Sequence, residues 1–293
     1  MKKSIFKNPI LPYLLVAPQL FVVILFFFWP AFDSLRLAIF NVSPFGDRMI
    51  FVGLGNFIDL LTSPEYYRSV YHSFIFSLGV TVSCISVAML LAVLVNQKIR
   101  GLAFYRSAIL WTFGMAPPIS GIIWLFIFHP TYGILSYGLA QITAYEFNWL
   151  LKGWIALLLV IFAASYAHLG YNVAFFLAAL QTIPNAVVEA ARMDGAGGLR
   201  LFRSITFPLL SPVTFFLVIM NMVFSFFETF GIIHAVTQGG PGDATTIMVY
   251  KVYVDGFVHL RMGLSAAQSV ILMALVIFLT VMQFRYAEKK VFY

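Results

Sequence analysis

Residues 187–208, VVEAARMDGAGGLRLFRSITFP, form a polar segment in a chain that is otherwise strongly apolar. The segment contains two acidic residues, three arginines and three glycines, and long apolar runs lie on both sides of it. Of the 293 residues, 61% are hydrophobic and only 10% are charged. A soluble domain of this length needs a more highly charged surface, so the composition predicts a polytopic membrane protein.

Six apolar runs are long enough to cross a bilayer as helices. They cover residues 12–35, 70–96, 107–128, 154–181, 208–232 and 265–285. Six spans place both termini on one side of the membrane. Twelve of the 18 lysines and arginines fall on that side and six on the other, which predicts cytoplasmic termini. The expected fold class is therefore an all-α polytopic membrane protein, with segment 187–208 in the longest cytoplasmic connection.

Motifs for nucleotide, metal or nucleic-acid binding are missing from the sequence. There is no GxxxxGK[ST] phosphate-binding loop, and the glycine-rich run at 195–200 has Arg200 where a dinucleotide site needs glycine. The five histidines are scattered and Cys84 is the single cysteine, so neither a metal site nor an internal disulfide is expected. Basic patches interleaved with aromatic residues are also missing, which disfavours nucleic-acid binding. The pattern disfavours an enzyme.

The polar segment has the start and stop residues of a short helix. Pro184 suits the first helical position, and Gly195 and Gly197 suit its end. A second short helix is expected over 199–207, ending at Pro208. Two roles of this segment remain open on physical grounds. It is either a rigid connector that lies on the lipid headgroups or a protruding docking site for a partner protein.

The spacing of residues in this segment resembles the EAA motif of ABC importer permeases. That motif reads Glu-Ala-Ala, three residues, Gly, nine residues, Ile, any residue, Leu, Pro. The matching residues are Glu189, Ala190, Ala191, Gly195, Ile205 and Pro208. Phe207 stands where leucine is usual, which is an apolar replacement. The resemblance implies the type I importer permease fold, in a bacterial inner membrane.

The resemblance also implies partners and a role for the motif. A periplasmic binding protein would deliver the solute, a second related permease would complete the pore, and two ATPase subunits would bind ATP and Mg, so that this chain itself needs no cofactor. The segment at 184–196 would be the coupling helix, seated on an ATPase. The residues implied in coupling are Glu189, Ala190, Ala191, Asp194, Gly195, Ile205 and Pro208. Asp194 has the alternative role of a local cap or a partner of Arg192.

Further segments extend the resemblance to nearly the whole chain. Runs such as LPYLLVAPQL, FVGLGNF, GGPGDATT and FRYAEKKVFY are similar to the first permease subunits of sn-glycerol-3-phosphate importers. That solute is therefore expected, with another sugar or polyol as the alternative. The expected organisation is 1–68 for the N-terminus, first span and external loop, 69–285 for the permease core, and 286–293 for a cytoplasmic tail. A secondary transporter working without ATP is disfavoured, because it needs more charge within the membrane.

Polar residues within or beside the spans are candidates for the solute path. They are Arg36, His168, Asn172, Asn221 and Glu228. For the two asparagines, hydrogen bonding between helices is an equally direct explanation. Glu228 would repel an anionic solute unless a cation such as Arg36 neutralises it. The double proline at 117–118 predicts a broken span, read either as a packing kink or as part of the path.

Overall fold

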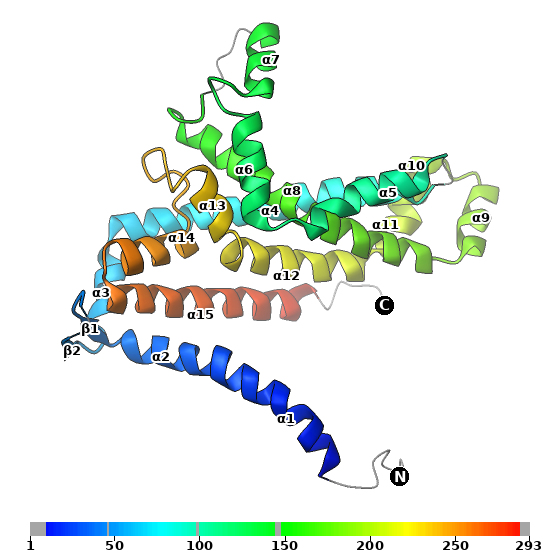
Figure 1. Ribbon diagram of the computed structural model, residues 1–293. Helices are drawn as coiled ribbons and strands as arrows, with labels where there is room; N and C mark the ends of the chain where they lie inside the picture. The colour runs from blue at the N-terminus through cyan, green and yellow to red at the C-terminus, as the bar shows by residue number, and fades with distance from the viewer. Residues whose placement is uncertain (1–9, 46, 98–99, 144–147, 288–293) are drawn as a thin grey trace. The chain divides into compact units, whose positions relative to one another are not determined.

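The computed structural model describes residues 10–45, 47–97, 100–143 and 148–287, and it is mostly helical (Figure 1). The chain forms two compact units. The first comprises Met1–Ser63 with Val252–Ile271, and the second comprises Pro64–Lys251 with Leu272–Tyr293. Helices α14 (Met248–Tyr253) and α15 (Met262–Ala287) contribute to both units.

The other elements follow in chain order. In the first unit they are α1 (Leu11–Val23), the π-helical turn η1 (Ile24–Phe28), α2 (Trp29–Leu37), β1 (Phe40–Val42), β2 (Met49–Phe51), α3 (Gly55–Thr62) and the π-helical turn η4 (Val254–Val258). In the second unit they are α4 (Pro64–Val95), α5 (Leu102–Leu110), the 3-10 turn η2 (Trp111–Gly114), α6 (Pro117–Ile127), α7 (Ile134–Thr143), α8 (Gly153–Thr182), α9 (Asn185–Met193), α10 (Gly198–Leu201), the π-helical turn η3 (Phe202–Thr206), α11 (Phe207–Leu209), α12 (Ser211–Phe227) and α13 (Phe230–Val236).

Helices that are long and apolar enough to cross a membrane match the predicted runs. In the described residues four continuous helices qualify, over Leu11–Leu37, Pro64–Val95, Gly153–Thr182 and Met262–Arg285. Two further pairs qualify as bent helices, Leu102–Gly114 with Pro117–Ile127 at 109° and Gly198–Leu209 with Ser211–Phe227 at 67°. The number of candidate spans is therefore four, or up to six if each bent pair crosses once.

The first unit contains a small β-hairpin that the all-α prediction missed. Strands β1 and β2 pair antiparallel, with Phe40 opposite Phe51. The side-chain amide of Asn56 on α3 donates hydrogen bonds to the carbonyls of Ala38 (2.8 Å) and Phe40 (3.0 Å), which fixes the entry to the hairpin. The strands are only three residues long, so their alternation is too short to be recognised in the sequence.

The double proline breaks the third predicted span, as expected. Ala116 is extended, with φ −62° and ψ 135°, and Pro117 begins α6. Proline is tolerated in the first turn of a helix because the N–H at that position has no intrahelical partner. The prolines therefore start a new helix at an angle of 109° to the one before it, rather than kinking a continuous helix.

Pro208 does not end the second short helix, contrary to the sequence-based expectation. Helical turns continue from Gly198 through Pro208 to Leu209, because the proline falls within the first two residues of α11, directly after the wider turn η3. The chain bends by 67° at Leu210 instead, where α12 follows. The predicted fifth span is also broken at its other end, since α12 stops at Phe227 and α13 begins at Phe230.

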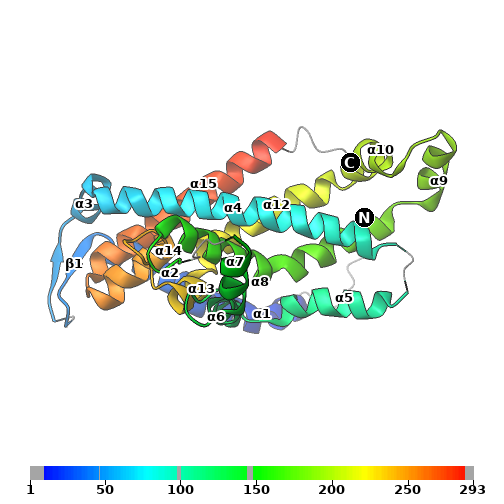
Figure 2. The same ribbon diagram turned by 90° about the horizontal axis from the view of Figure 1, so that it is seen from above.

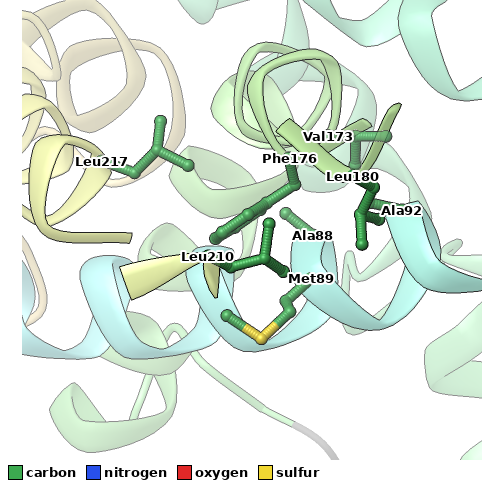
Figure 3. Packing of buried hydrophobic residues seen from close by; sticks show 8 residues of the cluster. All are labelled: Ala88, Met89, Ala92, Val173, Phe176, Leu180, Leu210 and Leu217. Carbon is green, nitrogen blue, oxygen red and sulfur yellow. The ribbon is translucent and has the colours of Figure 1, made fainter. Parts of the chain in front are cut away.

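The core of the second unit lies where α4, α8 and α12 pack together (Figures 1 and 2). Figure 3 shows the cluster of buried side chains that joins them, which we call the Leu210 cluster. Its members are Ala88, Met89, Ala92, Val173, Phe176, Leu180, Leu210 and Leu217. The alanines on α4 allow close approach of the neighbouring helix, and Leu210 places the bend before α12 at the centre of this contact.

Gly170 marks a second close approach, between α8 and η2. A Cβ atom at this position would lie 2.6 Å from Thr112 Oγ1 and 2.8 Å from the backbone nitrogen of Phe113. The Thr112 hydroxyl oxygen also accepts a 2.8 Å hydrogen bond from the Gly170 N–H. A side chain here would separate the broken third span from α8.

We therefore expect Gly170→Ala to lower the free energy of unfolding by about 1–3 kcal/mol through overpacking. The matched control is Gly138→Ala on α7, where no atom lies within 4 Å of the added Cβ and the change should be neutral or slightly stabilising. Denaturation of the purified protein in micelles measures both. Equal stability of the two variants would contradict the close contact.

Candidate functional site

Helix α9 is a short helix with well-defined ends, at one extremity of the second unit (Figure 2). Pro184 is extended at its N-cap, with φ −61° and ψ 132°, so the helix begins one residue later than predicted. At the other end the N–H of Gly195 bonds to the Arg192 carbonyl and the N–H of Ala196 to the Ala191 carbonyl, both at 3.0 Å. Gly195 has φ +78°, the left-handed conformation in which glycine is favoured. The predicted stop at Gly195 is confirmed.

The predicted coupling residues differ in exposure. Glu189, Ala190, Asp194 and Gly195 are exposed, Ala191 is buried, and Ile205 and Pro208 are half-buried. Within the described residues the Glu189 carboxylate makes no hydrogen bond or ion pair, and no ion pair joins Asp194 to Arg192. Asp194 instead acts through its backbone N–H, which bonds to the Ala190 carbonyl at the C-cap. The helix thus presents a free carboxylate beside small side chains.

Apolar side chains near α9 are also exposed. Met193 is 88% exposed and Leu199 is 73% exposed, and Val187 and Phe207 are exposed as well. Sequence reasoning did not select Met193 or Leu199, although both flank the glycines that end α9. They add exposed apolar surface beside α9.

A cavity of about 730 Å³ lies between α9 and the neighbouring ends of α4 and α8. Side chains from α4, α8, α9, α10 and η3, and from the turns that follow α4 and α8, line it, including Glu189 and Arg192 of α9. Helix α9 therefore stands away from the core of the second unit, although it is joined to it at both ends.

Asn172 on α8 and Asn221 on α12 form a reciprocal amide pair. Asn221 Nδ2 donates to Asn172 Oδ1 at 2.6 Å, and Asn172 Nδ2 donates to Asn221 Oδ1 at 3.3 Å. Both residues are fully buried, and Asn172 Nδ2 also lies 3.2 Å from Cys84 Sγ on α4. Of the two explanations left open by the sequence, hydrogen bonding between helices is the one seen. The sequence could not pair these residues because 49 positions separate them.

His168 lies one helical turn from Asn172 and is packed between aromatic rings. Its ring stacks on Tyr171, with centroids 4.7 Å apart, and on Phe224, at 4.1 Å. Its Nε2 atom is buried and has no hydrogen-bond partner among the described residues. Sequence reasoning missed Tyr171 and Phe224, although each follows a selected polar residue by three positions and so shares its helix face.

The two charged path candidates are exposed. Arg36 forms an ion pair with Asp33 at 3.8 Å, and Glu228 is the C-cap residue that follows α12, at the break before α13. Arg36 belongs to the first unit and Glu228 to the second, so their pairing stays a prediction.

Residues 65–293 match the family described as binding-protein-dependent transport system inner membrane component. The chain belongs to this family. It is a transport component of the inner membrane, as predicted, and not an enzyme.

Full-length relatives and solved structures agree with the assignment. The chain is 48% identical over 293 residues to the sn-glycerol-3-phosphate transport system permease protein UgpA of Rhizobium meliloti (strain 1021), covering 100% of both chains. It is 45% identical over 291 residues to the protein of the same name from Escherichia coli O157:H7, covering 99% of this chain and 98% of that one. A bacterial alginate ABC transporter, solved with a periplasmic protein that carries an alginate pentasaccharide, contains a chain of the same fold. The TM-score is 0.81 at 16% identity, over 96% of this chain and 95% of that one.

The amide pair gives a prediction about stability. Asn172→Leu or Asn221→Leu alone leaves the other amide buried without its partner and should cost about 1–3 kcal/mol of unfolding free energy. The double variant should cost less than the sum of the two single variants, because it leaves no orphaned amide.

Denaturation in micelles of the four proteins in this cycle measures the coupling. The control is Gln181→Leu, an exposed carboxamide near the end of α8, which should change stability by less than about 0.5 kcal/mol. Additive costs in the double variant would show that the two amides do not depend on one another.

Proposed function

We propose that this chain is the transmembrane permease subunit of an ATP-driven, binding-protein-dependent importer for sn-glycerol-3-phosphate. The assignment of the solute rests on the 45–48% identity, over essentially the whole chain, to relatives named for that transport system. A permease for another sugar or polyol is the second candidate, because the coupling segment is independent of the solute. An ATP-independent transporter would leave the EAA-like segment without a role.

Six spans with both termini in the cytoplasm form the proposed topology. The support is the correspondence of the six apolar runs with four continuous helices and two bent pairs. The distribution of twelve against six basic residues favours the same orientation. In this topology α9 lies in the cytoplasm, and the loop from Thr237 to Thr246 lies on the periplasmic face.

The proposed partners follow from the family. A periplasmic binding protein would dock on the external face, where the Thr245 hydroxyl lies within hydrogen-bonding distance of both Thr237 Oγ1 (2.7 Å) and the Gly240 carbonyl oxygen (3.0 Å) in a compact loop. A second permease and two ATPase subunits would complete the assembly. ATP and Mg would be bound by the ATPases, and this chain would bind no cofactor, in keeping with its lack of a phosphate-binding loop.

Coupling is assigned to α9 and the segment that follows it. Glu189 would anchor α9 on an ATPase surface, because its carboxylate is exposed and engaged by no described residue. Ala190 would keep that contact close, while Ala191 packs inward. Gly195 would allow the turn towards Ile205 and Pro208, whose side chains are half-buried.

Motion of α9 would reach the membrane through both of its flanking helices. α8 ends directly before α9, and α12 follows after the bend at Leu210. The Leu210 cluster and the Asn172–Asn221 pair join these two helices, so a displacement at α9 would move them together. Motion of α9 moves α8 and α12 together only if the contacts between these helices are rigid. Close-packed protein interfaces are rigid because they have low compressibility.

The solute path is proposed to pass His168, Asn172, Asn221 and Glu228, with Arg36 at its outer mouth. His168 Nε2 is the strongest candidate for solute contact, since it is buried and lacks a partner among the described residues. The two asparagines would have to exchange partners to bind solute. Glu228 would need a neighbouring cation to tolerate an anionic solute, and Arg36 is the residue proposed.

Glu189→Lys and Gly195→Pro should abolish coupling while the spans still insert. The first reverses the anchoring charge. The second cannot adopt φ +78° and removes the N–H that bonds to Arg192. Solute uptake and co-purification of the ATPase should both fall strongly, whereas Gly197→Ala should behave as wild type, because Gly197 has φ −67° and open space around its Cβ position. Normal uptake with normal assembly in both variants would refute the coupling role.

The solute assignment predicts which compound stimulates ATP hydrolysis by the reconstituted complex with its binding protein. sn-Glycerol-3-phosphate should stimulate it, and glycerol or a neutral disaccharide should not. In the same assay Arg36→Gln, Glu228→Gln and the double variant test the charged pair, since a double variant no worse than either single one indicates pairing. Stimulation by a neutral sugar would contradict the assignment of the solute but leave the assignment as a permease intact.

A further inference from the structure

A second cavity, of about 490 Å³, lies between α4 and α8 and shares no lining residue with the cavity beside α9. Its walls come from these two helices and from Phe128 at the end of α6, all within the second unit. Cys84 and Leu159 form part of a buried inner wall, while Val87 and Phe162 are 44% and 47% exposed at the open side. Small-molecule sites in proteins have volumes of about 300–1,000 Å³, so the cavity is large enough for a ligand.

Aromatic rings form one wall of the cavity, and they are held in place from behind. Phe162 and Tyr166 both pack edge-on against Trp124, with ring centroids 4.6 and 5.2 Å apart. Phe128 packs edge-on against Phe162 in turn, at 6.0 Å. Such pairs are favourable in this geometry. The wall is therefore formed without a ligand, as is usual for binding sites.

The two serines in the wall bond to the protein rather than to anything in the cavity. Ser165 Oγ donates a 2.7 Å hydrogen bond to the Ile161 carbonyl, and Ser83 Oγ lies 2.7 Å from Ser165 Oγ. None of the described residues that line the cavity is charged. A phosphate or a polyol would lose its hydrogen bonds to water here without replacement. The cavity therefore suits hydrocarbon and is unsuited to the proposed solute.

The position of the cavity along α8 places it at the depth of lipid tails. This step rests on the proposed function, in which α4 and α8 cross the bilayer, and both are long and apolar enough to do so. Helix α8 has 30 residues, about 45 Å of helix, against a hydrocarbon core of about 30 Å. Ser165 lies about 18 Å from the nearer end of α8, so it stays within the hydrocarbon wherever the helix is positioned along the membrane normal.

We propose that the cavity binds an acyl chain of a membrane phospholipid. The chain enters between Val87 and Phe162, and its methylene groups pack against the aromatic wall and Leu159. One side chain from a partner helix would fill only part of this volume, whereas a flexible hydrocarbon chain follows its whole length.

The bound chain would support the amide pair from the side of α4. Cys84 forms part of the inner wall, and its Sγ lies 3.2 Å from Asn172 Nδ2. Asn172 in turn bonds to Asn221, which joins α8 to α12. The atoms around an unfilled space have no contacts on that side, so filling the cavity adds dispersion contacts behind this junction.

The test uses the assembled complex with its partner subunits, in vesicles of phosphatidylcholine that contain a rising proportion of phosphatidylcholine with a diazirine in its acyl chain. After illumination, mass spectrometry of peptides locates the adducts. The variants are Val87→Trp, which places an indole at the open side of the cavity, and Val82→Trp. Val82 is the matched control, because it is an exposed valine of α4 that does not line the cavity. Leu90, which is 60% exposed on the same helix outside the cavity, reports non-specific contact with lipid.

In wild type, adducts on α8 between Leu158 and Leu169 should saturate at a low proportion of the probe, while adducts at Leu90 should rise in proportion to it. Val87→Trp should lower the adducts on α8 by about 10-fold or more, because loss of even two buried methylene groups weakens binding by that factor. Val82→Trp should leave them unchanged, and so should added sn-glycerol-3-phosphate.

The wild-type measurement decides the matter even if a variant fails to fold. Adducts on α8 that do not saturate in wild type would overturn the proposal, and this is also the result expected if a partner subunit fills the cavity. Equal labelling of Val87→Trp and Val82→Trp would overturn it as well. Displacement of the probe by sn-glycerol-3-phosphate would do the same, because it would assign the cavity to the solute path.

Failure of the lipid site differs from failure of the proposed function. Solute-stimulated ATP hydrolysis by a complex without saturable adducts would remove the lipid site alone. Saturable adducts on a chain that co-purifies with no ATPase would contradict the importer and leave the lipid site intact.

Discussion

The second unit depends on one constraint, that polar groups within an apolar interior must satisfy each other. Asn172 and Asn221 do so reciprocally, and their amides also bond to the carbonyls of His168 and Leu217 one turn earlier in the same helices. Such bonds between helices contribute only about 0.6–1.7 kcal/mol in membrane proteins. Their larger effect is on register, because sliding α12 along α8 would separate two buried amides and leave each without its partner.

Once register is fixed, packing provides the rest of the stiffness. The Leu210 cluster interlocks α4, α8 and α12 through close contacts, and dispersion between packed side chains accumulates over many atom pairs. Lipid tails are as apolar as these side chains, so the advantage of the native arrangement is its fit rather than exclusion from water. Glycines at contact points follow the same logic, since Gly121 and Gly170 lie where an added Cβ would clash with a neighbouring helix.

Sequence reasoning reached the parts of this arrangement that depend on local chemistry. Apolar length located the helices that are long enough to cross a membrane, the glycine at position 195 located the end of α9, and the double proline located the break before α6. It failed where the outcome depends on distant contacts. The sequence predicted a helix end at Pro208. The chain turns at Leu210 instead, because the Leu210 side chain is buried against α4 and α8. The Asn172–Asn221 pair and the stacking of His168 on Phe224 likewise join separate helices and leave no local pattern.

The shortness of α9 has its own physical consequence. A helix of nine residues is below the length of about 12–15 residues at which isolated helices become stable, so its order must come from elsewhere. Its C-terminal carbonyls are satisfied by the turn at Gly195, while a cavity lies on its inner side and exposed residues on its outer side. Whatever occupies those two sides therefore sets how rigidly α9 is held. An ATPase groove on its outer side would stabilise the helix, because a partner that binds only the ordered α9 shifts its equilibrium away from disordered conformations.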